Sequence, residues 1–200
     1  MIRKKYFNTT GPCFPEMHYM LPPEDRLRGA QLNRYIRDQL YWVLHAPRQT
    51  GKTTFLQSWM REINTAGEAM ACYVSVEQCQ GIAEPERAIP AMCESILFYC
   101  SVFGLPSPVI DKNNEPATML QDTLKNWAEV VAPKPLVVLF DEVDVLVGET
   151  LISFLRQLRG GFAGRGTGKF PTSIALVGMP PVVDEWIWLC NITMSGISLK

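Results

Sequence analysis

Short apolar runs alternate with helical stripes along most of this chain, which leaves few folds open to it. Four runs are almost uniformly hydrophobic, as strands are in a sheet covered on both faces: residues 40–46, 70–76, 136–140 and 173–177. Apolar residues recur at helical spacing before the first run, over residues 24–40. They do so again between the runs, over residues 51–63, 86–103, about 117–131 and 151–159. Strands that alternate with helices imply right-handed crossovers, so the sequence predicts an α/β fold with a mostly parallel sheet and helices on both faces.

The helical stripe over residues 86–103 has two features of its own. We expect Pro90 to mark its first turn, and its inward residues to be Ile89, Cys93, Ile96, Leu97 and Cys100. The chain has six cysteines without a Cys-x-x-Cys pair and only two histidines, so zinc spacing is absent. We therefore interpret Cys93 and Cys100 as small apolar residues on one buried face.

Composition excludes several classes of protein. Of the 200 residues, 47% are hydrophobic and 20% are charged, which is typical of one globular domain and not of a disordered or fibrous chain. The net charge of −1 provides no global basic field, so a protein that coats nucleic acid is disfavoured, although a local patch stays open. No membrane span and no signal-peptide core are apparent, and we expect an intracellular, cytoplasmic protein without membrane contact.

Residues 46–54 have the pattern of a phosphate-binding loop set between a strand and a helix. Against G-x-x-x-x-G-K-[ST] the segment matches at Gly51, Lys52 and Thr53, with Ala46 where the first glycine usually lies. Lys52 would reach the β and γ phosphates of a nucleotide, and the Thr53 hydroxyl would join a Mg²⁺ shell. The expected nucleotide-binding residues of the loop are Ala46, Pro47, Arg48, Gln49, Thr50, Gly51, Lys52, Thr53 and Thr54. The alternative is a Gly-Lys helix start that binds no ligand.

An acidic pair ends the apolar run at residues 136–140. Asp141 would lie at the carboxyl end of that strand, beside the phosphate loop, and hold Mg²⁺ through water. Glu142 could polarise a water for attack on the γ-phosphate. Taken alone, the pair would indicate a solvated turn, but together with the loop it predicts a metal and catalytic site. Two roles are open for Asp144, a carboxylate near the metal and a helix cap, and the sequence favours neither.

A glycine-rich segment at residues 163–169 looks like a second phosphate loop, but Phe170 stands where Ser or Thr should follow the lysine. No buried strand precedes it, so we expect a flexible loop. Four basic residues around it would suit an arginine finger or a phosphate-backbone contact, and a solvated loop is the alternative that we favour: Arg156, Arg159, Arg165 and Lys169.

The chain resembles prokaryotic AAA-like ATP-binding proteins of the AAA/STAND type. The resemblance covers about residues 7–180 and rests on the phosphate loop, on Asp141-Glu142-Val143-Asp144, on the helix at 151–159 and on the arm at 8–22. It implies the three-layer P-loop NTPase sandwich of the additional-strand type, in which the fourth strand separates the strands that end at the loop and at Asp141. It also implies that Tyr19 and Leu21 lie against the adenine of ATP.

The resemblance suggests three parts: an extended N-terminal arm at 1–23, a P-loop ATPase domain at 24–182 and an atypical C-terminal tail at 183–200. Such proteins usually carry a polar sensor residue after the fourth strand and continue well beyond this length. Residues 176–181 lack that residue, which predicts slow turnover because no group there would orient the attacking water. Residues 186–192 do not resemble the expected continuation, so we expect a truncated or frame-altered member. These apolar residues would then fill a fifth strand imperfectly or form an exposed edge that favours self-association.

These observations predict an ATPase with ATP and Mg²⁺ as cofactors. Glu142 and Lys52 would be catalytic, Thr53 and Asp141 would hold the metal, and turnover would switch or remodel a protein or nucleic-acid partner, with a homo-oligomer left open. The alternative is a nucleotide sensor that holds ATP without turnover. A GTPase needs an Asn/Thr-Lys-x-Asp motif, which is absent, and a small-molecule kinase needs an Arg-rich lid, which is also absent.

Overall fold

A computed structural model describes residues 4–8, 11, 13, 16–19, 29–45, 47, 50–179 and 195–198. In this part of the chain, five parallel strands form one sheet in the order β2-β3-β4-β1-β5. The strands are β1 (Tyr41–His45), β2 (Met70–Ser75), β3 (Leu136–Asp141), β4 (Ser173–Gly178) and β5 (Ser195–Ser198). Because β4 lies between β1 and β3, the predicted additional-strand order is confirmed.

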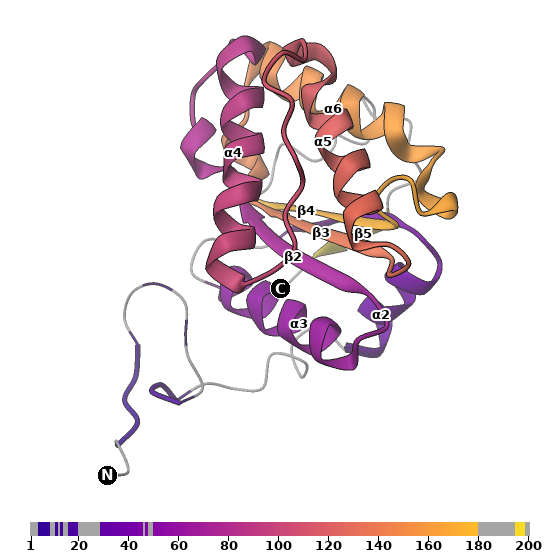
Figure 1. Ribbon diagram of the computed structural model, residues 1–200. Coiled ribbons are helices and arrows are strands. Elements are labelled where there is room, and N and C mark those ends of the chain that lie inside the picture. Colours follow the sequence, from indigo (N-terminus) through magenta and orange to yellow (C-terminus); the bar gives the residue numbers. More distant parts are fainter. Residues whose placement is uncertain are drawn as a thin grey trace.

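Helices cover both faces of this sheet, as Figure 1 shows. One face carries α2 (Gly29–Arg37) and α3 (Lys52–Ala66). The other face carries α4 (Pro85–Phe103), α5 (Pro116–Val131) and α6 (Gly148–Phe162). The connections contain the short 3₁₀ helices η1 (Glu77–Cys79), η2 (Val143–Val145) and η3 (Arg165–Thr167). The result is the three-layer sandwich that the sequence predicts.

Each strand buries alternate side chains on opposite faces, because successive residues of a strand point in opposite directions. In β1, Trp42 and Leu44 pack against α2 and α3, while Tyr41 and Val43 pack on the side of α4 to α6. This burial on both faces accounts for the nearly continuous hydrophobic runs. The stripe predicted for α3 is confirmed as its buried face, namely Phe55, Leu56, Trp59, Met60 and Ile63.

The prediction for the start of α4 is wrong. The helix begins at Pro85, and Pro90 lies inside it, in the second turn. Proline is tolerated at the first position because the N–H group that it lacks would have no helical partner there, and Pro85 takes that position. Cys93 and Cys100 are fully buried as expected, whereas Leu97 is only half-buried.

The strand position beside β1 is filled by β5 (Ser195–Ser198). Residues 186–192, for which a fifth strand or an exposed edge was expected, lie outside the described residues. The described residues between 4 and 19 contain no helix, and Tyr6 and His18 form a parallel bridge there. No described helix is long and apolar enough to cross a membrane.

Candidate functional site

The phosphate-loop pattern lies where β1 ends and α3 begins. Gly51 has φ 81°, a left-handed conformation that glycine adopts without the steric cost of a Cβ, and α3 starts at the next residue. The Pro47 carbonyl accepts the Lys52 ammonium at 2.8 Å and the Thr50 hydroxyl at 2.9 Å. The other predicted loop residues, Ala46, Arg48 and Gln49, lie outside the described residues.

The amino end of α3 has the backbone groups that an anion site needs. The N–H of Phe55 donates to the Gly51 carbonyl at 2.9 Å and is the first of the regular helical bonds. The N–H groups of residues 52–54 precede that bond, so the helix itself offers them no partner. Aligned N–H groups at a helix start attract phosphate. The Thr54 hydroxyl accepts the Cys13 N–H at 3.0 Å, which brings the arm to this first turn.

The structure brings Thr53 and Asp141 together across 88 residues of sequence. The Thr53 hydroxyl donates to Oδ2 of Asp141 at 2.7 Å, and the Tyr73 hydroxyl donates to the same oxygen at 3.1 Å. Oδ1 accepts the backbone N–H of Glu142 at 3.0 Å. Asp141 is 1% exposed, so its carboxylate is held among three donors at the end of β3.

Glu142 is fixed by its backbone and by a hydroxyl from the neighbouring strand. Its φ of 62° is left-handed, which is uncommon for a residue with a side chain and turns the chain directly after β3. Ser75, which is in register with Asp141, donates to Oε2 of Glu142 at 2.6 Å. The Ser75 oxygen in turn accepts the N–H of Glu77 at 3.2 Å. The last residues of β2 therefore supply one hydroxyl to each acid of the pair.

Both carboxyl groups have perturbed acidities. Burial raises the pKa of Asp141, while the hydrogen bonds from Thr53, Tyr73 and the Glu142 N–H, and the charge of Lys52, act in the opposite direction. Burial also raises the pKa of Glu142; Ser75 opposes this shift, and the charges of the neighbouring acids add to it. Two acids with raised pKa values at the end of one strand are typical of a functional site.

The carboxyl end of the fourth strand has little room for a side chain at Gly178. The strand ends at Gly178, and a Cβ on that residue would lie 2.6 Å from Oδ1 of Asp144 and 3.1 Å from the Asp144 backbone nitrogen. Asp144 lies in η2 and is half-buried, so its carboxylate occupies the space into which a side chain on β4 would project. The described contacts support neither of the two roles left open for Asp144: the cap position of η2 is Glu142, and the Asp144 carboxylate packs at the end of β4.

Gly178→Ala should therefore lower the free energy of unfolding by about 1–3 kcal/mol, because the added methyl group overpacks against a backbone atom that cannot rotate away. Urea unfolding of both proteins measures the difference. Gly166→Ala is the matched control, since its Cβ would meet only the end of the flexible Gln39 side chain at 3.1 Å. Equal stability of Gly178→Ala and wild type would contradict this account of the missing side chain.

Arg165 makes its contacts away from the site, and the arginine finger that was weighed against a solvated loop finds no support within the described part of this chain. Its guanidinium donates to the carbonyls of Gln39 at 3.0 Å and Phe162 at 2.9 Å, and lies 3.6 Å from the centre of the Phe162 ring. Gln39 precedes β1, whereas the phosphate loop follows it, so the two ends are roughly 16 Å apart along five residues of strand. Residues 163–169 include η3 instead of being a wholly irregular loop, and Arg156, Arg159 and Lys169 are exposed.

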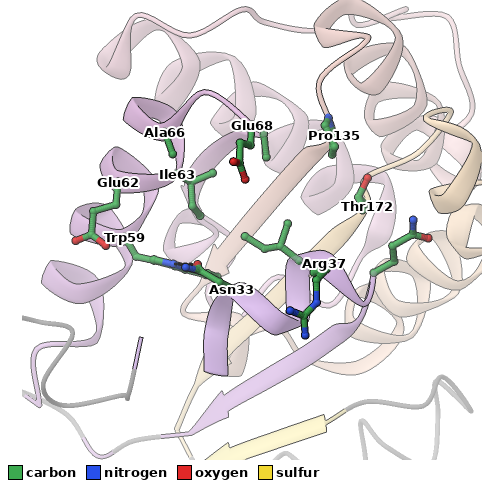
Figure 2. A pocket seen from close by; sticks show the side chains of 12 residues that line it. Asn33, Arg37, Trp59, Glu62, Ile63, Ala66, Glu68, Pro135 and Thr172 are labelled. Carbon is green, nitrogen blue, oxygen red and sulfur yellow. Dashed lines mark hydrogen bonds between the residues drawn. The ribbon is translucent and has the colours of Figure 1, made fainter. Parts of the chain in front are cut away.

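A cavity of about 500 Å³ lies at the opposite end of the sheet from the acids. Figure 2 shows it between α2, which contributes Asn33 and Arg37, and α3, which contributes Trp59, Glu62 and Ile63. Pro135 and Thr172, which also line it, directly precede β3 and β4. The cavity is therefore at the amino ends of the strands and is separate from the phosphate loop.

The predicted adenine contacts fall in the arm. Tyr19 is about half exposed and packs on Phe7, with the two ring centres 5.1 Å apart. Leu21 lies outside the described residues, so an adenine site at Tyr19 and Leu21 stays a prediction.

Sequence reasoning missed Tyr73 and Ser75. Both lie in the apolar run at residues 70–76, which the sequence marks only as a strand, and their acidic partners are 68 and 67 residues away. One signal was present: two hydroxyl side chains at alternate positions near the carboxyl end of a strand point to the same face.

Comparison with known proteins supports the fold. A Walker-type ATPase of Pyrococcus abyssi is similar with a TM-score of 0.65 and 14% identity, covering 96% of this chain and 57% of that chain. Drosophila ORC bound to poly(dA/dT) DNA and Cdc6 gives a TM-score of 0.60 and 12% identity, covering 88% of this chain and 29% of that chain. Cdc6p from Pyrobaculum aerophilum gives a TM-score of 0.54 and 15% identity, covering 90% of this chain and 46% of that chain.

No protein-family model matches the sequence, and no curated protein matches it. The chain spans between 29% and 57% of the length of these three structures. At identities of 12% to 15% the likeness concerns the arrangement of the backbone. Together with the strand order, it shows that this chain has the α/β fold of P-loop NTPases.

Proposed function

We propose that this chain binds ATP together with Mg²⁺ at the loop before α3 and hydrolyses it. The observation that carries the proposal is the 2.7 Å hydrogen bond between the Thr53 hydroxyl and Asp141. It joins the first turn of the helix after the Gly-Lys pair to the acid at the end of β3, the two places from which P-loop enzymes hold a metal. The similar fold of the Walker-type ATPase of Pyrococcus abyssi supports the same proposal.

The residues present fit a magnesium ion. Mg²⁺ prefers hard oxygen ligands and keeps several waters, and this site offers a hydroxyl from Thr53 and a buried carboxylate from Asp141. When bound, the ion would neutralise negative charge on the β and γ phosphates. Lys52 would leave the Pro47 carbonyl, which keeps the Thr50 hydroxyl as a donor, and would bind the same phosphates.

Glu142 is the proposed general base. Ser75 donates to its Oε2, and the proposed acceptor of the proton from the attacking water is Oε1, to which no described group donates. The hydrogen bond from Ser75 and the left-handed backbone limit the orientations of this side chain, so the accepting oxygen is held before substrate arrives.

A second function, a nucleotide sensor that binds ATP without turnover, is favoured by one observation. Gly178 has no side chain with which β4 could orient the attacking water, and Asp144 fills the space beside it. Intact Glu142 favours hydrolysis instead. The two functions differ in whether phosphate is released.

Turnover would drive a conformational switch or the remodelling of a partner. The similar Drosophila ORC structure is bound to DNA and Cdc6, which keeps nucleic acid beside protein among the candidate partners. Assignment to the prokaryotic AAA/STAND type, the division into arm, domain and tail, the cytoplasmic location and a homo-oligomer are predictions of the sequence alone.

Calorimetry with ATP and GTP, each with Mg²⁺ and with EDTA, tests the binding, and a phosphate-release assay tests the turnover. We expect ATP to bind more tightly than GTP, tighter binding with Mg²⁺, and release of phosphate. Binding without release would establish the sensor. Absence of ATP binding under all conditions would refute the proposed function.

A further inference from the structure

Tyr73 is the one described side chain outside the loop and β3 that donates directly to Asp141. It lies in β2, two residues before Ser75, and its hydroxyl is 3.1 Å from Oδ2 of Asp141. Neither the phosphate-loop pattern nor the acidic pair includes it. The Tyr73 hydroxyl is therefore a contact of Asp141 that the sequence motifs do not account for.

The Tyr73 ring is held on several sides, so its hydroxyl has a fixed direction. The side chain is 3% exposed and packs edge-to-face on Tyr99 and Phe103 of α4, with ring centres 5.2 Å and 6.4 Å away. Tyr99 and Phe103 are themselves stacked, at 6.1 Å. The Tyr73 backbone N–H points to the Met60 sulfur at 3.3 Å, which ties this point of β2 to α3. A ring packed in this way cannot follow a moving carboxylate.

The Tyr73 hydroxyl determines which oxygen of the Asp141 carboxylate can still accept a hydrogen bond. Each carboxylate oxygen can accept about two hydrogen bonds. Oδ2 of Asp141 accepts Thr53 and Tyr73, and is therefore filled, whereas Oδ1 accepts only the N–H of Glu142. One acceptor position of the carboxylate is left, and it is on Oδ1. Without the Tyr73 hydroxyl, both oxygens would offer an open position and the carboxylate could turn.

We propose that Tyr73 is a positioning residue that fixes the Asp141 carboxylate with Oδ1 toward a bound divalent cation and its waters. This inference rests on the proposed function, because it assumes that Asp141 serves such a cation. Groups that orient metal ligands from behind typically change metal affinity by about 10- to 100-fold when removed. Unlike Lys52, which would bind the phosphates, Tyr73 would act on the cation through Asp141.

Tyr73→Phe removes the hydroxyl and keeps the ring contacts, so we expect it to fold. The experiment measures ADP binding by calorimetry across a Mg²⁺ titration, and repeats it with Mn²⁺ followed by electron paramagnetic resonance, so neither measurement depends on turnover. We expect the Mg²⁺ midpoint of Tyr73→Phe to rise about tenfold, with ADP affinity in EDTA unchanged.

Tyr41→Phe is the matched control. Tyr41 is also a buried strand tyrosine, 1% exposed, but its hydroxyl donates to the Pro171 carbonyl at 3.1 Å, at the other end of the sheet. We expect its Mg²⁺ midpoint to equal that of wild type. An unchanged midpoint in Tyr73→Phe, or an equal shift in both variants, would overturn the inference while leaving the proposed function intact. A wild type that binds no nucleotide, or binds it without any response to Mg²⁺, would overturn both.

Discussion

Lys52→Ala is expected to weaken ATP binding at least tenfold while the fold survives. Lys52 is the first residue of α3, and its ammonium is hydrogen-bonded to the Pro47 carbonyl of the same loop. Charge-assisted contacts to phosphate are about twice as strong as neutral ones, so their loss should appear directly in the affinity. The fold should tolerate the change because the Pro47 carbonyl retains the Thr50 hydroxyl and alanine favours a helix.

Calorimetry with ATP and Mg²⁺ measures this effect, and circular dichroism checks the fold. Lys125→Ala is the control, because Lys125 is an exposed lysine of α5 and its loss changes the net charge equally. If Lys52→Ala bound ATP as tightly as Lys125→Ala, the loop before α3 would not be the phosphate site.

Glu142→Gln is expected to retain ATP binding and to reduce phosphate release by about a hundredfold or more, the range that a general base contributes. The amide has nearly the shape of the carboxylate, and its oxygen can still accept the Ser75 hydroxyl, but it cannot take a proton from water. A turnover number that falls without a change in the ATP dissociation constant would separate a chemical role from a binding role.

Glu129→Gln serves as the control for this charge change, since Glu129 is exposed on α5. Single-turnover phosphate release and calorimetry are measured on both variants. Wild-type release by Glu142→Gln would mean that another group accepts the proton. Loss of ATP binding in Glu142→Gln would instead mean that this residue has a structural task in the loop region.

The sequence predicted those parts of the site that depend on neighbours in the chain. The Gly51-Lys52-Thr53 spacing and the acid after a buried strand are local patterns, and their meeting follows from the parallel topology, which places the carboxyl ends of strands at one edge. Tyr73 and Ser75 escaped prediction because they reach the acids only through the pairing of β2 with β3. The local sequence of either strand does not reveal that pairing.

One further contact escaped prediction, and one prediction failed, for related reasons. Arg165 looked like part of a basic cluster, but its contacts are to backbone carbonyls of Gln39 and Phe162, which spacing cannot reveal. Pro90 was assigned to a first turn because proline is common there, whereas Pro85 already fills that position and tertiary packing carries the helix past the second proline. The periodicity of apolar residues predicted which segments are helices and strands, but it did not predict the residues at which they begin and end.

Selection for heat resistance alone would act against Glu142. Its φ of 62° costs a residue with a Cβ about 1 kcal/mol or more, and glycine would avoid that cost. A library screened for residual structure after heating should therefore enrich glycine or asparagine at this position, while a screen for turnover should return glutamate. The two screens would therefore select different residues at position 142. A more thermostable variant that keeps turnover has to gain its stability at other positions and retain Glu142.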